Sequence, residues 1–147
     1  MPDIVKGLLV IAFLIMLLMV PNIKLVQVNK ALVVERLGRF LKIVDHPGIY
    51  ITIPLLDRVV EIVPLDIQEK TFTIKITDET TEYKVYIKYR VINIKLFVYA
   101  ALDSIQTIKE YIRDHTEISN SFTKEEEHLI REYADNLGVE IIELCLK

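Results

Sequence analysis

The chain of 147 residues has little of three things on which many functional sites depend: it contains one cysteine, four glycines and no excess of positive charge. The lone Cys145 cannot form an internal disulfide or a cysteine-based metal cluster, so the fold does not depend on an oxidising compartment. Four glycines do not provide a phosphate-cradling loop. A net charge of −3 gives no electrostatic basis for nucleic-acid binding. The sequence therefore predicts neither a nucleotide cofactor nor a nucleic-acid partner.

A catalytic constellation is missing as well. No two histidines have the i, i+4 spacing of a metal-binding helix, and neither an HExxH motif nor a carboxylate cluster accompanies them. The serines lack the Gly-flanked turn of a nucleophile elbow. The residues considered are His46, His115, His128, Ser104, Ser119 and Ser121. We therefore predict no catalytic residue, no cofactor and no metal ion, and a small hydrolase is the weakest of the functions considered.

The one long hydrophobic run lies at the N-terminus. Residues 8–20 (LLVIAFLIMLLMV) carry no polar side chain, Ile4 and Val5 extend the run upstream, and Pro21-Asn22 ends it. As a helix over residues 4–20 it is about 25 Å long, a little short of the ~30 Å hydrocarbon core of a bilayer. No small-x-small cleavage site follows it, which disfavours a signal peptide, and the lack of a polar face disfavours a buried core helix. The run predicts a membrane anchor over residues 1–22, formed by Ile4, Leu8, Ile11, Phe13, Leu14, Leu17 and Val20.

Positive charge is distributed unevenly around this segment. Lys6 and the amino terminus lie on one side, and a larger set of basic residues lies on the other. That set is Lys24, Lys30, Arg36, Arg39 and Lys42. The asymmetry predicts a C-terminal domain on the cytoplasmic face of the membrane. Whether the segment spans the bilayer or only inserts into it stays open.

Residues 23–147 predict one β-rich domain of the α+β class. Hydrophobic residues make up 52% of the chain and charged residues 27%, a mixture typical of a membrane segment joined to a water-facing domain. Short runs of β-branched and aliphatic residues stop at the turn-prone Gly38 and Pro47-Gly48. The predicted strands cover residues 23–29, 31–38, 48–54 and 58–63.

Alternating residues next predict a long antiparallel hairpin. Phe72, Ile74 and Ile76 share one side of its first strand, and the apolar residues from Tyr83 to Val91 continue the alternation after a polar turn at 78–80. Period-two alternation on both sides of a turn is typical of a hairpin with one wet face. That face carries Lys84, Tyr86, Lys88 and Arg90. It is either an ordinary solvated face or a basic surface that lies near anionic headgroups.

The last third of the chain predicts helices. A short amphipathic segment begins at Lys95, and Asp103 or Ser104 then caps a helix that carries isoleucines at helical spacing. Thr123, with Glu126 three positions later, forms a capping box for a second helix.

A strand closes the sequence. Gly138 is expected to end the preceding helix in a left-handed backbone conformation. Residues 139–146 (VEIIELCL) then predict a strand that is buried along nearly all its length, with Cys145 as a buried structural thiol.

The order of these pieces is informative: an anchor, VVERLGRF (33–40), HPGIYITIPLLDRV (46–59), a long hairpin, helices and GVEIIELCL (138–146). In this order the chain resembles the stomatin/prohibitin/flotillin (band-7, SPFH) domain family over essentially its whole length. Matching positions in the two signatures are Glu35, Arg36, Gly38, Phe40, Pro47, Gly48, Pro54, Asp57 and Arg58; the others are Thr77, Asp78, Tyr89, Arg90, Val91, Gly138 and Val139. We interpret Asp57 and Arg58 as structural, with Asp57 capping a turn and Arg58 beginning a strand.

The resemblance implies a non-enzymatic, membrane-anchored protein that forms homo-oligomers and organises membrane lipid or partner membrane proteins. Two departures from the family's pattern matter, and the lack of a coiled coil after the closing strand favours an alternative. The family usually continues past the closing strand into an Ala/Glu-rich coiled coil, and its helical region is longer than residues 103–138. The alternative is an accessory subunit that modulates a single membrane partner, such as a protease or channel. In either case, exposed edge strands are the expected docking surfaces.

Overall fold

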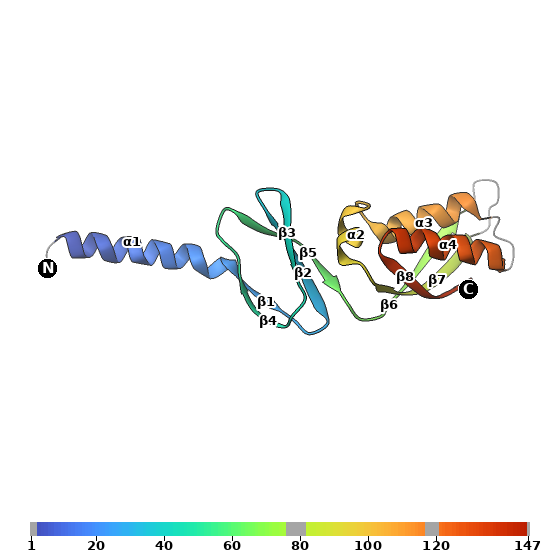
Figure 1. The fold of residues 1–147 in the computed structure, drawn as a ribbon, viewed down its shortest axis with the longest axis horizontal. Coiled ribbons are helices and arrows are strands. Elements are labelled where there is room, and N and C mark those ends of the chain that lie inside the picture. Colours follow the sequence, from blue (N-terminus) through green and yellow to red (C-terminus); the bar gives the residue numbers. More distant parts are fainter. Residues whose placement is uncertain (1–2, 76–81, 117–120, 147) are drawn as a thin grey trace. The chain divides into compact units, whose positions relative to one another are not determined.

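The computed structural model describes residues 3–75, 82–116 and 121–146, and the chain separates into two compact units, residues 1–62 and 63–147 (Figure 1). The predicted α+β class with antiparallel sheets is confirmed. The elements are α1 (Asp3–Met19), the 3-10 turn η1 (Val20–Asn22), β1 (Ile23–Val26), β2 (Lys30–Arg36), β3 (Arg39–Val44), β4 (Gly48–Ile51), β5 (Asp57–Pro64), β6 (Gln68–Lys75), β7 (Glu82–Val91), α2 (Ile94–Tyr99), α3 (Ser104–His115), α4 (Lys124–Asn136) and β8 (Val139–Leu146).

The N-terminal helix forms where the sequence predicts it, but it is shorter than a membrane crossing requires. Helix α1 has 17 residues, and Val20 lies beyond it in η1. At 1.5 Å per residue such a helix is about 25 Å long. Within the part of the chain that the structure describes, no helix combines the length and hydropathy needed to cross a membrane. The membrane-helix part of the predicted fold is therefore not supported.

The first unit contains two small antiparallel sheets around β2. Strand β1 pairs with β4, and β2 lies between β3 and β5. Strand β2 is buried from Ala31 to Glu35. Its core consists of Val26, Leu32 and Val34, with Val44, Tyr50 and Val59 packed against them.

Strand β3 is an element that the sequence did not predict. It forms a hairpin with β2 through a two-residue turn in which both Leu37 and Gly38 have positive φ, 51° and 77°. Positive φ at both central positions is the mark of a type I′ turn, whose strands follow the natural sheet twist. Leucine rarely occupies such a position, which explains why the residue pattern alone did not predict the second strand; the family resemblance implies a strand pair and turn there.

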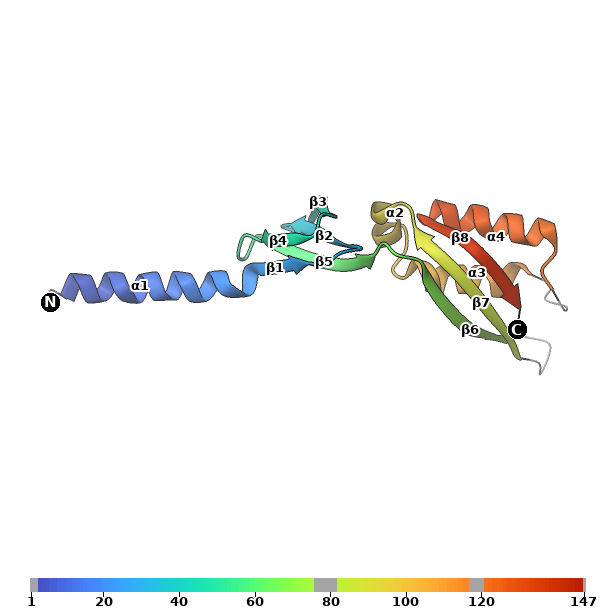
Figure 2. The same cartoon turned by 90° about the horizontal axis from the view of Figure 1, so that it is seen from below.

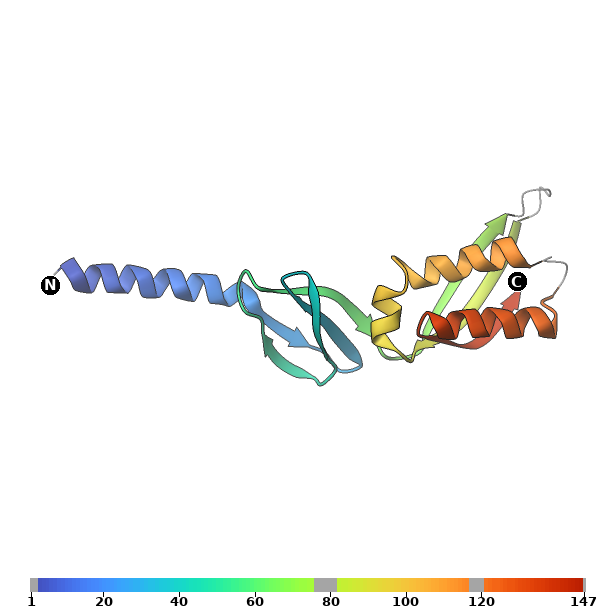
Figure 3. The same cartoon turned by 45° about the horizontal axis from the view of Figure 1, so that its top comes forward.

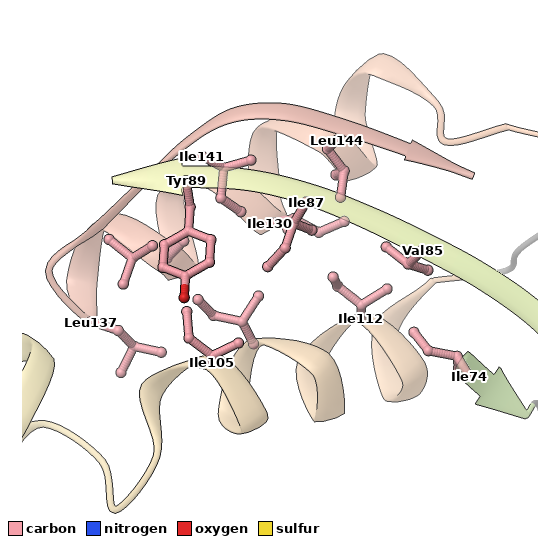
Figure 4. Close-up of a cluster of buried hydrophobic side chains, with 13 residues drawn as sticks. Ile74, Val85, Ile87, Tyr89, Ile105, Ile112, Ile130, Leu137, Ile141 and Leu144 are labelled. Carbon is pink, nitrogen blue, oxygen red and sulfur yellow. The ribbon is translucent and has the colours of Figure 1, made fainter. Parts of the chain in front are cut away.

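The second unit is a three-stranded antiparallel sheet, β6-β7-β8, with α3 and α4 side by side on one face (Figures 2 and 3). The predicted hairpin is confirmed, and its first strand begins earlier, at Gln68. Ile76 and the turn at 78–80 fall outside the described residues. The buried core joins the inward side chains of the sheet to the isoleucines of α3 and α4 (Figure 4).

Both predicted helix caps are present. The side chain of Asp103 accepts hydrogen bonds from the backbone N–H groups of Ile105 and Gln106, each at 3.0 Å. Thr123 and Glu126 form the reciprocal capping box. Helix α3 ends at His115, and residues 117–120 lie outside the described residues.

The closing strand occupies the predicted residues, but its burial differs from the prediction. A register shift between Lys88 and Tyr89 of β7 places a bulge in the pairing with β8. Ile142 and Glu143 are exposed there, and Cys145 is only half-buried. The bulge is the physical reason, because an inserted residue changes which side chains face the core.

Candidate functional site

The feature of the first unit that most needs an explanation is an exposed aliphatic surface on the β1–β4 sheet. Ile23 lies opposite Ile51, and Leu25 lies opposite Ile49. Directly opposed residues of antiparallel strands share one face, so these four side chains form one surface. Their exposed fractions are 51% for Ile23, 69% for Leu25, 73% for Ile49 and 54% for Ile51. We call these four residues the aliphatic surface.

The other face of the same sheet shows why this surface is exposed. Val26, opposite Gly48, is buried at 2% exposure, and Tyr50 packs against the same core cluster. A two-stranded sheet with one face on the core must present its other face outward. In a water-facing protein that outward face carries polar residues; here it is entirely aliphatic.

Hydrogen bonds fix the chain that leaves η1 to the sheet that carries the aliphatic surface. The backbone N–H of Thr52 donates to the carbonyl of Asn22 at 2.9 Å, and its hydroxyl donates to the same carbonyl at 3.0 Å. The hydroxyl also lies 3.2 Å from the Asn22 side-chain oxygen. Thr52 is 2% exposed. The segment that follows α1 is therefore held against the end of β4 rather than attached loosely.

Two ion pairs join β2 to the start of β5. Arg36 donates to both carboxylate oxygens of Asp57, at 2.7 and 3.2 Å, and Arg58 donates to Glu35 at 3.3 Å. The Asp57 carboxylate also accepts the backbone N–H of Ile53 at 2.9 Å. The Arg36 guanidinium, followed by this N–H, holds the pKa of Asp57 below its ordinary value. The pair is therefore fully formed at neutral pH, and its contribution is lost only as the pH falls through that lowered pKa.

These contacts shape a turn that presents a further leucine. Leu55 has φ +67° and is 94% exposed. It lies in the turn between Ile53, whose N–H donates to Asp57, and Leu56. The Leu56 carbonyl accepts the N–H of Leu37 at 2.9 Å, and Leu37 is itself 74% exposed in the β2–β3 turn. Two leucine-bearing turns are thus held together by a backbone hydrogen bond.

A comparison with known families gives these features a context. A sequence model of the SPFH domain / Band 7 family matches residues 24–147. The chain belongs to the Band 7 (SPFH) family. The family is generally membrane-associated and scaffold-like, and it is typically non-enzymatic. No curated protein matches the sequence.

The Band 7 signature positions lie mainly at turns and ion pairs of the first unit. Glu35, Arg36, Asp57 and Arg58 make the two ion pairs. The other positions of these two signatures lie as follows: Gly38 in the β2–β3 turn, Phe40 opposite Glu35 on β3, Pro47 directly before β4, Gly48 at its start, and Pro54 in the turn before Leu55. Of the matching positions in the hairpin, Thr77 and Asp78 lie outside the described residues. In the described parts of the chain no three His, Cys, Asp or Glu side chains are placed to hold a metal ion.

The basic face that was predicted on the hairpin is a mixed-charge face instead. Lys88 lies 3.3 Å from Glu69 on β6, and Arg90 pairs with Glu140 on β8 at 2.6 Å. The prediction placed only β7 residues on this face; the neighbouring strands supply acids opposite the bases. Its use as a basic lipid-binding surface is therefore not supported.

The aliphatic surface is the part of the site that sequence reasoning missed. The alternation of Ile23 and Leu25, and of Ile49 and Ile51, was visible. Such alternation ordinarily marks the core-facing side of a strand. The pairing of β1 with β4 decides that Val26 and Tyr50 face the core instead.

Proposed function

We propose that this Band 7 protein is a non-enzymatic scaffold that is anchored to a membrane, assembles into homo-oligomers, and organises membrane lipid or partner membrane proteins. The observation that carries the proposal is the aliphatic surface, whose first strand, β1, follows the apolar helix α1 and the turn η1 in the sequence. Contiguous apolar surface of this kind on a soluble unit marks a site of interaction with a membrane or a protein.

The free energy of transfer from water favours the membrane as the partner of the aliphatic surface. Complete transfer of one Leu or Ile side chain from water is worth about 1.5–3 kcal/mol. Four side chains that are half to three-quarters exposed therefore supply on the order of 5 kcal/mol at a bilayer interface. The apolar side chains of α1 are exposed from Ile4 to Leu17 and add a larger contribution. In this proposal α1 inserts into the bilayer and the aliphatic surface rests on it.

Sidedness follows from the basic residues of the first unit. Lys24, Lys30 and Arg39 follow α1 closely in the sequence, whereas Lys6 is the one basic side chain before its apolar run. We therefore place both units on the cytoplasmic side.

Charge placed in α1 is expected to release the protein from membranes. In the variant Ile11→Asp/Leu14→Asp the two carboxylates lie one turn apart on the same side of the helix. Each charge in the middle of an inserted helix costs about 2.5–3.5 kcal/mol, so the pair reduces membrane binding by at least about a thousandfold. Flotation with phospholipid vesicles measures the bound fraction.

The matched control is Ile11→Ala/Leu14→Ala, which shortens the same side chains without adding charge. We expect the alanine variant to float with the vesicles. If the aspartate variant floats equally well after an alkaline wash, insertion of α1 is wrong.

The assembly is tested by the mass of the native particle after gentle extraction from its own membrane. We expect a discrete homo-oligomer of many copies. A particle of one or two copies contradicts the scaffold, and a different protein recovered at fixed stoichiometry identifies an accessory subunit instead.

A further inference from the structure

Strand β6 lies at one edge of the sheet in the second unit. The sheet order β6-β7-β8 makes β6 and β8 its edge strands, and in the described chain β6 pairs with β7 alone (Figure 2). On the β8 side, Arg131 of α4 donates a hydrogen bond to the carbonyl of Ile141. An edge strand of eight residues presents backbone N–H and C=O groups that attract another strand.

The side chains on the outward face of β6 form a pattern that is complementary to itself when the strand is reversed. Glu69 stands near one end, Lys75 at the other, and Thr71 and Thr73 between them, all exposed. Each charge already faces its opposite on β7: Glu69 lies 3.3 Å from Lys88, and Lys75 lies 2.7 Å from Glu82. Phe72 is the midpoint of this pattern.

We propose that β6 pairs antiparallel with β6 of a second copy of the chain, with the two-fold axis at Phe72. The inference rests on the proposed homo-oligomer and names its contact. In this register Glu69 lies opposite Lys75 of the second copy, and Thr71 lies opposite Thr73. The same surface serves both copies, as a two-fold interface requires. Opposite charges and threonine pairs placed directly across strands stabilise a sheet.

The charges beyond β6 extend the same row. Glu143 on β8 lies opposite Lys88, which lies opposite Glu69. In the proposed interface Glu69 lies opposite Lys75 of the second copy, which in turn lies opposite Glu82 of that copy. The row alternates in sign at every step, and symmetry repeats it at the other end of the interface.

Other registers do not reproduce this arrangement. A shift of the pairing by two positions places Glu69 opposite a threonine of the second copy. A shift by four positions places Lys70 opposite Lys70 of the second copy, so two like charges meet. An odd shift brings outward side chains opposite inward ones, which a sheet with one buried face excludes.

Complementary charge reversals test the edge. Full-length chains carrying Glu69→Lys and Lys75→Glu are produced separately and together, with different tags. Each variant alone brings like charges together twice across the axis, whereas the mixed pair restores both opposite-charge contacts. Each substitution also removes an ion pair within its own chain, to Lys88 for Glu69→Lys and to Glu82 for Lys75→Glu. This loss does not depend on which variant the chain pairs with. We expect mixed pairs to exceed same-variant pairs by about tenfold in native mass spectrometry.

Cysteine pairs test the register. On a Cys145→Ser background, Thr71→Cys and Thr73→Cys chains are mixed under mild oxidation. Opposed residues lie about 4.5–5.5 Å apart between Cα atoms, within the range of a disulfide, whereas a residue and its own copy lie about 7–8 Å apart. We expect the mixture to cross-link at least about tenfold more than either variant alone.

The results separate this inference from the proposed function. A wild-type particle of many copies without mixed-pair preference or mixed cross-linking overturns the β6 contact and leaves the scaffold standing. A wild-type particle of only two copies that shows both effects supports the contact and contradicts the scaffold. A wild-type monomer overturns both.

Discussion

Replacement of Gly138 by alanine is expected to destabilise the second unit more than any other single-methyl change. Gly138 has φ +76°, where a β-carbon costs roughly 1–2 kcal/mol. That added carbon also overlaps the Asn93 carbonyl oxygen and comes within 3.0 Å of the Leu96 β-carbon and the Phe97 nitrogen. The neighbours cannot withdraw easily, because the Gly138 carbonyl accepts backbone N–H groups from Ile92 at 2.9 Å and Asn93 at 3.1 Å.

Strain and overlap together predict a loss of about 3 kcal/mol or more in the free energy of unfolding of this unit. Hydrogen exchange measured by mass spectrometry on the detergent-solubilised full chain gives the stability of each segment. We expect exchange in β7 and β8 to become more than about a hundredfold faster.

Gly38 is the matched control for this change. It has φ +77°, but an added β-carbon there has no neighbour within 4 Å. Gly38→Ala therefore adds strain without overlap, and we expect a loss of about 1–2 kcal/mol confined to the β2–β3 hairpin. Equal effects of the two substitutions would show that the packing of α2 against Gly138 is not as close as described.

Gly138 also illustrates what the sequence could predict. Its positive φ follows from its place after an amphipathic helix, and the capping box of Thr123 and Glu126 follows from spacing alone. The hairpin of β6 and β7 follows from strict alternation. These features depend on residues close together in the sequence, where propensity and periodicity act directly.

Long-range pairing could not be predicted in the same way. Arg36 and Asp57 are 21 residues apart, and their ion pair depends on how β2 and β5 are aligned. No local pattern determines that alignment. The close approach of α2 to Gly138 and the outward orientation of the aliphatic surface likewise depend on which elements pack together. The motifs identified the residues of the first unit, and the fold determines what they contact.

Two neighbouring isoleucines of β8 show the same limit within one strand. Ile141 is 3% exposed and Ile142 is 42% exposed. In the run VEIIELCL both are apolar, and the sequence alone led to the prediction that nearly the whole strand is buried. Neighbouring residues of a strand point to opposite faces, so Ile141, opposite the core residue Tyr89, faces the core and Ile142 faces away from it.

Substitution of each isoleucine by alanine therefore has very different expected effects. Ile141 belongs to the core of the second unit with Tyr89 and Ile130 (Figure 4). Ile141→Ala leaves a cavity there and is expected to cost about 2–5 kcal/mol in the free energy of unfolding. Ile142→Ala removes the same atoms from a partly exposed side chain and is expected to cost about 1 kcal/mol or less.

The comparison isolates burial, because the two substitutions change the same side chain in the same strand and lose the same β-propensity. Tyrosine fluorescence during urea unfolding follows the second unit, since all tyrosines but Tyr50 lie in it. A shift of the unfolding midpoint for Ile141→Ala that far exceeds that for Ile142→Ala supports the register in which Ile141 lies opposite Tyr89 and faces the core. Equal shifts would mean that β8 pairs with β7 in another register. Glu143 would then no longer lie opposite Lys88, and the row of charges that crosses the β6 contact would lose its outermost residue.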